Sequence, residues 1–434
     1  MLTIKDGNIK RNNSKVVIGY DLGKNFSQIS IYFSGSEEPQ TVSSVAGTEM
    51  YNIPTVLAKR PGVGQWFYGR EALKYAQSEG ILVDDLLYKA TRGEEVIVED
   101  ESYDPVALLS LFVKRSLGLL NMYISPKNLE AFMFTVSDLN PRVVEVLNKV
   151  VAHLSLNCEK ITYQSHQESF YSYMIHQPHE LWDYQTLILD YNDTLTTMRF
   201  EVARHTIPEV AFIHQKDMDS ITKVDWSEDE TRKKQQMQEL DERFIDPLKA
   251  LLSEGDITTV YLLGDGFKEP WMDESLRVVC KNRRVFQGNN LYSKGACYSI
   301  MDKLEPSEVA KSHVYLGESK VKSNIGLKAL RRGADSYFAI LDAGTDWFEA
   351  KSDFDIILDE GNELNFVVTS LTGGRVIEKP IVLDGLPSRP RGTTRLRIHI
   401  EMSAVNVLEI EIEDLGFGEL FKSSGRAWAH SLSI

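Results

Sequence analysis

The hydrophobic pattern of this chain changes its period near residue 310, and that change restricts what the chain can fold into. Beyond this point, apolar and polar residues alternate with a period of two in segments such as NELNFVVTS (362–370), RLRIHIEM (395–402) and VLEIEIEDLG (407–416). Gly, Asp and Pro separate these segments, as they do between strands. Six or more short strands with little helical signal predict a β-sandwich over residues 325–434.

Before residue 310 the pattern is that of alternating strands and helices. Apolar runs at 131–137, 186–192 and 260–266 predict buried strands, and PRVVEVLNKVVAHLS (141–155) has helical spacing with Pro141 in its first turn. Such alternation predicts an α/β domain over residues 1–310. The polar stretch 311–324 is expected to be a linker, with GESKVKSN (317–324) as its best candidate segment, and the charged stretch 214–250 a solvated helix.

Composition narrows the class of protein. The 434 residues carry a net charge of −15, which disfavours nucleic acid and anionic membranes as partners because phosphates would be repelled. No apolar run approaches the roughly 20 residues that span a bilayer, and the first 15 residues lack the apolar core of a secretory signal. The cysteines, Cys158, Cys280 and Cys297, are widely scattered. We therefore expect a cytoplasmic protein with no membrane segment, disulfide framework or cysteine-based metal site.

A turn that could hold phosphate lies between the first two predicted strands. In VVIGYDLGKNFSQISIYF (16–33), Gly23 would let the backbone approach an anion, and Asp21 could orient a hydrated Mg²⁺. Taken alone, a turn with Asp and Gly is more often purely structural.

Five segments in order, and a sixth near the C-terminus, resemble the seventy-kilodalton heat-shock chaperones. The first five are IPTVLAKRPGVGQWFYGREA (53–72), FTVSDLNPRVVEVLNKVVAHLSL (134–156), TLILDYNDTLTTMRFEV (186–202), VYLLGDGFKEPWM (260–272) and VFQGNNLYSKGACYS (285–299). The sixth is IVLDGLPSRPRGTTRLRIHIEMSAVNVLEIEIEDLGFG (381–418), which resembles a long segment of the chaperones' β-sandwich substrate domain and includes Pro-Arg-Gly at 390–392.

The resemblance implies a two-lobed actin-like (ribonuclease H-like) ATPase domain, with a shortened second lobe, followed by a β-sandwich that binds peptides. It also implies ATP or ADP with Mg²⁺ as a weakly held cofactor. Asp190 and Lys89 would be catalytic, and Asp21 and Asp190 would hold Mg²⁺ through water. The implied nucleotide-binding residues are Asp21, Gly23, Lys24, Asn25, Thr194, Gly264, Asp265 and Gly266.

The chain departs from the family where the chemistry would occur. The glycines of the second phosphate loop are replaced around Tyr191, Asn192 and Asp193, although such a loop needs the positive φ angles that glycine allows. A Glu-Pro pair of the family is replaced by Ser165-His166, where capping or packing by the histidine is favoured over metal ligation. The family's helical lid is expected to be missing, because the chain stops at Ile434.

These departures leave three hypotheses. The first is a chaperone-like interaction protein with a degenerate nucleotide site, which binds a partner protein or extended peptide through its β-domain by strand addition. The second is a slow ATPase chaperone that uses Asp21, Lys89 and Asp190. The third is another actin-like protein, such as a sugar or acetate kinase or a filament former, which would not account for residues 381–418.

Overall fold

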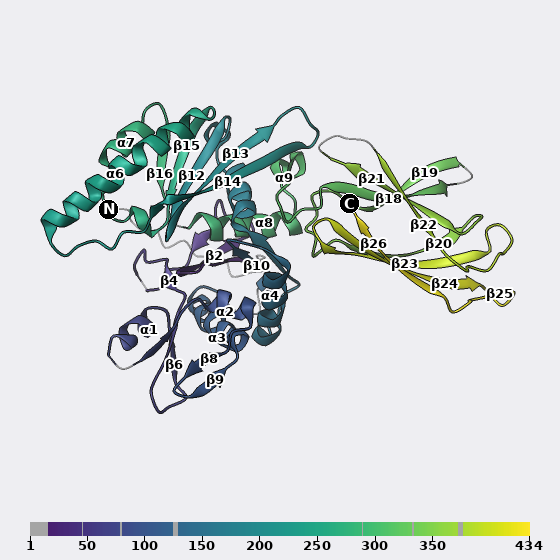
Figure 1. Ribbon diagram of the computed structural model, residues 1–434, viewed down its shortest axis with the longest axis horizontal. Helices are drawn as coiled ribbons and strands as arrows, with labels where there is room; N and C mark the ends of the chain where they lie inside the picture. Colours follow the sequence, from purple (N-terminus) through teal and green to yellow (C-terminus); the bar gives the residue numbers. More distant parts are fainter. Residues whose placement is uncertain are drawn as a thin grey trace. The chain divides into compact units, whose positions relative to one another are not determined.

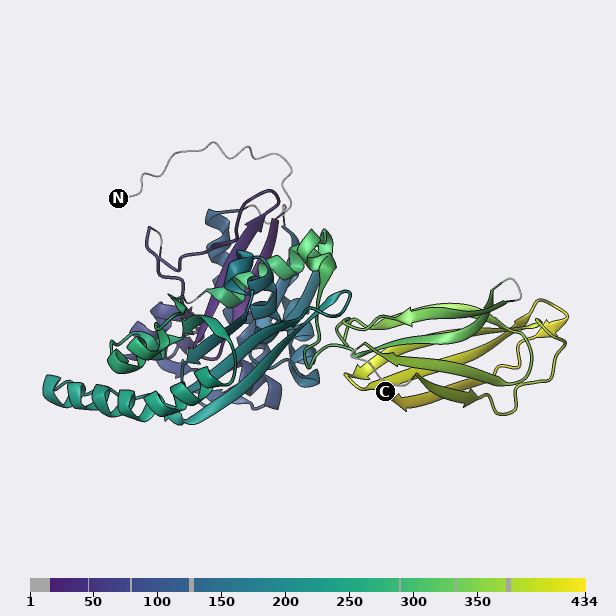
Figure 2. The same ribbon diagram turned by 90° about the horizontal axis from the view of Figure 1, so that it is seen from above.

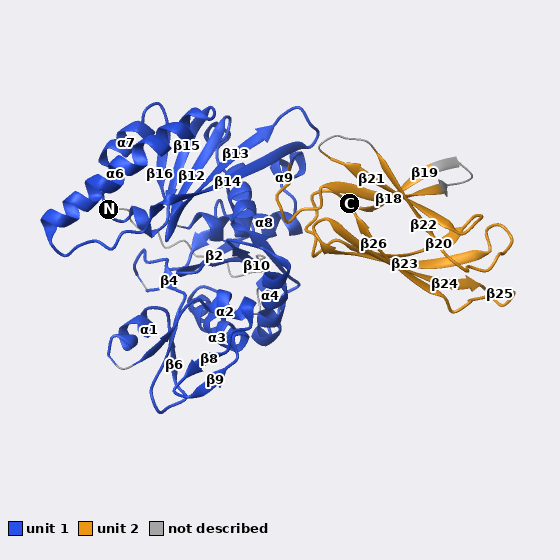
Figure 3. Cartoon of the chain, viewed as in Figure 1, with its two compact units in different colours: residues 1–313 blue, residues 314–434 orange. Residues whose placement is uncertain are grey.

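The structure is a computed structural model in which the chain divides into two compact units, residues 1–313 and 314–434 (Figure 3). It describes residues 16–45, 47–78, 80–124, 129–288, 290–331, 334–371 and 376–434. The boundary between the units falls inside the short strand β17 (His313–Tyr315).

The first unit contains two large sheets with the same arrangement of strands (Figure 1). In each, the strand that comes first along the chain (β1 or β12) pairs antiparallel with the next strand (β2 or β13) and parallel with a later one (β10 or β15). One sheet has the order β11-β10-β1-β2-β3, and its strands are β1 (Val16–Leu22), β2 (Phe26–Phe33), β3 (Gln40–Thr41), β10 (Leu129–Val136) and β11 (Lys160–Ser165); β4 (Ile53–Pro54) pairs with β2. The other has the order β16-β15-β12-β13-β14-β17, with β12 (Gln185–Tyr191), β13 (Thr194–Ala203), β14 (Glu209–Thr222), β15 (Ile257–Leu263) and β16 (Arg284–Gln287).

Two helices cross where the sheets meet, α5 (His166–Ile175) and α8 (Leu291–Leu304). A Cβ atom on Gly295 of α8 would lie 1.9 Å from the carbonyl oxygen of Ser169 on α5, so only glycine permits this close crossing. A Cβ atom on Gly19 of β1 would likewise lie 2.1 Å from the carbonyl oxygen of Ser293. These two contacts hold α8 tightly against both α5 and β1, immediately behind the turns described below.

Helices α3 (Pro105–Leu117), α4 (Pro141–Leu154), α6 (Glu230–Ser253) and α7 (Asp273–Val279) cover the two large sheets (Figure 1). Leu240, Phe244 and Leu248 of the long helix α6 pack in a core with Trp271 and strand β12. The charged stretch 214–250, expected to be one helix, instead begins with the end of β14 and continues with most of α6, because residues 214–218 and Thr222 pair with β13.

A smaller subdomain is inserted between β4 and α3. It contains β5 (Leu57–Lys59), β6 (Trp66–Tyr68), α1 (Gly69–Ala76), β7 (Ile81–Val83), α2 (Leu86–Arg92), β8 (Val96–Val98) and β9 (Glu101–Tyr103). The described part of the first unit also contains the short helices η1 (Gly118–Met122), η3 (His179–Leu181), η4 (Asp265–Phe267) and α9 (Glu308–Ser312).

One apolar helix, Pro105–Met122, is long enough by length and composition to cross a membrane. Leu109, Phe112 and Val113 on this helix have no exposed surface, because they pack into the first unit. A core helix of a folded domain passes the same length and composition test, so this helix is weak evidence for a membrane segment.

The second unit consists of two facing sheets (Figure 2). One has the order β19-β18-β21-β22, and the other β20-β23-β24, with β25 and β26 both paired to β24. Along β23 buried and exposed residues alternate, with Leu396, Ile398 and Ile400 buried. The strands are β18 (Ser323–Arg331), β19 (Ala334–Leu341), β20 (Lys351–Leu358), β21 (Glu363–Ser370), β22 (Ile377–Val382), β23 (Thr394–Ala404), β24 (Val407–Phe417), β25 (Phe421–Lys422) and β26 (Ala427–Ser433).

The stretch 311–324, predicted to be a linker, has regular structure and buried side chains. It contains the end of α9, all of β17 and the first residues of β18. Lys320 is buried and pairs with Asp346 at 2.8 Å, and Val321 has no exposed surface. Its polar composition suggested solvent exposure, but Asp346 provides a buried partner that lies 26 residues away and has no signature in the local pattern.

Candidate functional site

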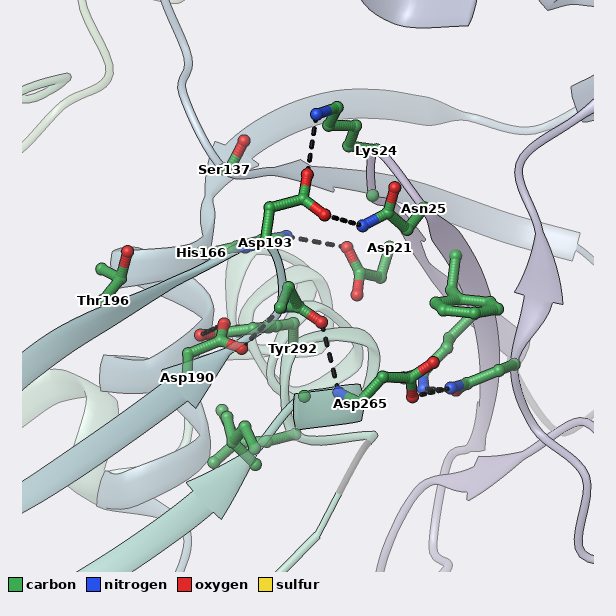
Figure 4. Close-up of a pocket in the computed structure, with 18 of the residues that line it drawn as sticks. Asp21, Lys24, Asn25, Ser137, His166, Asp190, Asp193, Thr196, Asp265 and Tyr292 are labelled. Carbon is green, nitrogen blue, oxygen red and sulfur yellow. Dashed lines mark hydrogen bonds and ion pairs between the residues drawn. The ribbon is translucent and has the colours of Figure 1, made fainter. Parts of the chain in front are cut away.

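A cavity of about 280 Å³ opens between the two large sheets of the first unit. Its walls come from the β1–β2 turn, the β12–β13 turn, the end of β15 and the first residues of α5 and α8 (Figure 4). The lining residues are Asp21, Gly23, Lys24, Asn25, Phe26, Gln28, Asn52, Ser137, His166, Asp190, Asn192, Asp193, Thr194, Thr196, Met198, Gln215, Leu263, Gly264, Asp265, Leu291 and Tyr292.

The two turns are joined by the carboxylate of Asp193. Lys24 Nζ lies 2.7 Å from Asp193 Oδ2, and Asn25 Nδ2 donates to Asp193 Oδ1 at 3.1 Å (Figure 4). The hydrogen bond from Lys24 holds the pKa of Asp193 below its ordinary value, so this carboxylate is an anion at neutral pH. The donors of the first turn are therefore engaged by an anionic group of the protein itself.

Behind this contact, the two aspartates predicted to hold Mg²⁺ have partners within the protein. His166 Nε2 lies 2.7 Å from Asp21 Oδ1, and the His166 ring stacks on Tyr292 with centroids 3.9 Å apart. The Tyr292 hydroxyl donates to Asp190 Oδ2 at 2.8 Å. Asp21 and Asp190 are thus connected through an imidazole and a phenol that stack on each other.

Both oxygens of Asp190 accept hydrogen bonds, because Asn192 Nδ2 donates to Oδ1 at 2.8 Å. Burial raises the pKa of Asp190 above its ordinary value, against the opposing effects of Tyr292, His166 and Asn192. Burial also raises the pKa of Tyr292, which keeps the phenol protonated as a donor. A carboxyl group with a raised pKa and two occupied oxygens is a poor ligand for hydrated Mg²⁺.

Glycines shape the backbone on both sides of the cavity. A Cβ atom on Gly23 would lie 2.3 Å from the carbonyl oxygen of Phe26. Gly264 has a φ of 91°, and a Cβ atom there would lie 2.3 Å from the carbonyl oxygen of Tyr191. Gly266, predicted to bind nucleotide, does not line the cavity, because it packs under the Tyr191 ring. The β15 turn is therefore fitted to Tyr191, one of the residues that replaced the loop glycines.

A line of polar side chains crosses the opposite wall. Asn52 Nδ2 donates to Asp265 Oδ1 at 3.3 Å, and Lys268 Nζ lies 2.7 Å from the same oxygen. Gln28 donates to Asn52, while Gln28 Oε1 is buried and has no hydrogen-bond partner among the described residues. Asp265 thus has two partners within the protein, as Asp193 does.

Lys89, predicted to be catalytic, is not among the residues that line the cavity. It lies on α2, where its Nζ donates to the carbonyl oxygen of Asp84 at 2.7 Å and to Asp84 Oδ1 at 2.8 Å. The lysine folds back over the start of its own short helix, onto a carboxylate five residues earlier. Thr194 does line the cavity, at the start of β13.

No group of three or more His, Cys, Asp or Glu side chains that could hold a metal ion occurs in the part of the chain that the structure describes. The cavity combines the buried Asp21 and the half-buried Asp190 with a lysine, a histidine and neutral amides, most of them already paired. This arrangement can hold the two sheets together across the cavity.

Sequence reasoning missed the role of Tyr292, although it lies in one of the segments that carried the resemblance. His166 was expected to cap or pack, and it stacks on Tyr292 while bonding Asp21. Ser165 supplies the cap of α5 by accepting from the Glu168 backbone N–H at 3.2 Å. No local pattern marks Tyr292, because its partners lie about 100 residues or more away in the chain.

Comparison with known protein families gives two matches that divide the chain near the boundary between the units. The C-terminal part of a family of unknown function (DUF5716) matches residues 38–318, and a domain of unknown function (DUF8552) matches residues 320–434. The first match covers most of the chain, and the protein belongs to this family. A search of curated proteins finds no significant match.

Proposed function

We propose that this protein is a divergent, chaperone-like interaction protein of the seventy-kilodalton heat-shock type. In this proposal the first unit is an actin-like domain that no longer cycles on nucleotide, and the second unit binds a partner protein or extended peptide. The observation that carries the proposal is the contact of Asp193 with Lys24 and Asn25, which puts a carboxylate of the protein against the donors that a phosphate would use.

The architecture supports the first part of the proposal. The two large sheets repeat one strand order, and each begins with a strand–turn–strand whose turn lines the same cavity. A duplicated α/β lobe with a site between the halves is the arrangement that the resemblance implies. Fold alone does not decide activity, which depends on the residues in the turns.

Those residues do not fit Mg-ATP as they stand. Asp193 would lie against a phosphate group, and two like charges about 4 Å apart repel by about 1–4 kcal/mol in aqueous to surface-like surroundings. The oxygens of Asp190 are occupied by Tyr292 and Asn192, and one oxygen of Asp21 by His166. Binding of the nucleotide would require these contacts to break before new ones formed.

A slow ATPase is the second candidate. Two observations favour it: Asp21 and Asp190 line the same cavity, and a glycine turn occurs at Gly264. The ATPase hypothesis requires both. It is weakened by Lys89, which pairs with Asp84 away from the cavity. A kinase or filament former has no comparable support and leaves the second unit unexplained. A cytoplasmic location is part of the same proposal.

Isothermal titration calorimetry of the full chain with Mg-ATP and Mg-ADP tests the proposal. We expect no binding heat up to about 1 mM nucleotide, which corresponds to less than about 4 kcal/mol of binding free energy. Micromolar binding that Asp190→Ala abolishes would reject the degenerate site and favour the ATPase. Ser423→Ala, a change in the second unit, serves as the matched control and should leave the titration unchanged.

A further inference from the structure

In the described part of the second unit, strands β19, β20, β22, β25 and β26 lie at sheet edges, and they differ in how they are protected. Strands β19 and β20 lie at one side of the unit, where the rings of Phe338 and Phe354 are 5.3 Å apart. β20 also carries Lys351 and Asp353, and β22 contains Pro380. Charges and proline are the usual protection of an edge against another strand.

Strand β26 has none of this protection. Its sequence, AWAHSLS, contains no Lys, Arg, Asp, Glu or Pro, and no strand other than β24 pairs with it among the described residues. Ala427, Ala429 and Ser431 are exposed, whereas Trp428, His430 and Leu432 between them are half-buried. A seven-residue unprotected edge is a template for strand addition.

The hydrogen-bond register shows which backbone groups are available on this edge. Just beyond the ends of β26, the Ile434 N–H donates to the Asn406 carbonyl, and the Asp414 N–H donates to the Arg426 carbonyl. In the register of β24 and β26, these bonds put the even-numbered residues of β26 in hydrogen-bonded pairs with β24. The N–H and C=O groups of Ala427, Ala429, Ser431 and Ser433 therefore point to the open edge.

The neighbouring strand gives the edge a charge preference. Glu409, Glu411 and Glu413 of β24 are opposite Ser431, Ala429 and Ala427 on the solvent face of the sheet. Because the β26 residues are small, a long cationic side chain on an added strand could reach over them to the glutamates. The other face continues the interior, where Trp428 and Leu432 are opposite the buried Ile412 and Leu408.

We propose that β26 is the binding edge for an extended peptide segment in which basic and apolar side chains alternate. The peptide pairs with Ala427, Ala429, Ser431 and Ser433 through its backbone, directs Lys or Arg toward Glu409, Glu411 and Glu413, and places apolar residues beside Trp428 and Leu432. This inference deepens the proposed function, since it names the surface and the ligand class of the second unit.

Fluorescence anisotropy with the full chain tests the inference, using a labelled nine-residue peptide that alternates lysine and valine and a second peptide with glutamate in place of lysine. The lysine peptide should bind at least about tenfold more tightly at low salt, and added salt should weaken it. Ala429→Pro removes an edge N–H that β24 does not use, and should weaken binding about tenfold or more. Ala429→Ser keeps that N–H and should bind as the unmodified chain does.

A charge-reversed variant tests the same edge without changing its backbone. Glu411→Lys combined with Glu413→Lys alters two exposed side chains and should reverse the preference toward the glutamate peptide. Equal binding of both peptides, binding that ignores both Ala429→Pro and the charge reversal, or no binding of the lysine peptide would overturn the inference. Self-association of the chain that Ala429→Pro abolishes would assign the edge to a second copy and overturn it as well.

These outcomes are separate from the nucleotide titration that tests the cavity of the first unit. Peptide binding that ignores β26 would leave an interaction protein with a different surface, so the proposed function would stand. Micromolar nucleotide binding would reject the hypothesis of a degenerate nucleotide site, whatever the peptide result.

Discussion

Two ion pairs with the same closest N···O distance lie in the two units, and their surroundings differ completely. Lys24 and Asp193 are 2.7 Å apart across the cavity of the first unit, with side chains 61% and 45% exposed. Arg389 and Asp414 are also 2.7 Å apart in the second unit, with side chains 5% and 0% exposed. The distance is the same, but water screens the first pair and is excluded from the second.

The buried pair is also more fully bonded. Nη1 and Nη2 of Arg389 both donate to Asp414, and the backbone N–H groups of Gly416 and Ser424 donate to the same carboxylate. This network attaches the segment that contains Pro390 to the end of β24. We infer that the buried pair holds the second unit in one conformation. The exposed pair joins the two turns across the cavity of the first unit by a contact that can open.

The largest effect expected from this difference is on the stability of the second unit. Arg389→Met leaves Asp414 buried without its cation and should lower the free energy of unfolding by about 3–5 kcal/mol. Hydrogen exchange measured by mass spectrometry on peptides from residues 394–417 would detect it. Arg391→Met is the matched control, because Arg391 pairs with Asp359 in solvent and its loss should have little effect. Equal protection in both variants would contradict the comparison.

Acid should also lower the stability of the second unit, because it protonates the carboxylate of the buried pair. The Arg389 hydrogen bonds hold the pKa of Asp414 well below its usual range, so its contribution to stability is present above an unfolded pKa of about 3.9 and is lost as pH falls. We expect the second unit to lose stability below about pH 4. In Asp414→Asn this part of the pH dependence should be missing, which denaturant titrations from pH 7 to pH 2 would measure. An unchanged slope would show that other carboxyl groups dominate.

A smaller effect is expected on the affinity of the cavity in the first unit for phosphate-containing ligands. Asp193→Asn removes the carboxylate that engages Lys24 and should raise affinity for Mg-ATP or inorganic pyrophosphate by about tenfold, within the range of the like-charge repulsion removed. Calorimetry would measure it, with Asp193→Glu as the control that keeps the charge. Identical affinity in the Asn and Glu variants would show that Asp193 does not exclude anions.

The smallest effect is expected on the stability of the first unit. Lys24→Ala breaks a pair whose side chains are about half exposed, so it should change the free energy of unfolding by only about 0–1 kcal/mol. Hydrogen exchange of peptides from residues 16–33, measured at increasing urea concentration, would detect the change. Added salt should reduce the difference between the variant and the unmodified chain further. A loss as large as that of Arg389→Met would mean that the cleft contact is structural.

The sequence by itself was informative wherever a property depends on neighbours along the chain. The change of period near residue 310 lies close to the unit boundary at 313, and the strand ends bearing Asp21 and Asp190 were located from apolar runs and turn residues. Alternation and helical spacing report which side chains are buried, so they indicate elements and their order. The charged stretch 214–250 is largely exposed as expected, but its first residues end strand β14 instead of forming one helix, and the polar stretch 311–324, expected to be a linker, buries Lys320 and Val321.

Only the tertiary structure decided which side chains meet. Asp193 engages Lys24 from 169 residues away, Tyr292 reaches Asp190 across 102 residues, and Lys89 turns to Asp84 rather than to the cavity. The same polar residue can bind a ligand, close a cleft or support a buried pair, and its partner and its exposure to water determine which. The partner of a residue and its exposure to water depend on how strands that are distant in the sequence are arranged in space. No local sequence pattern reports that arrangement.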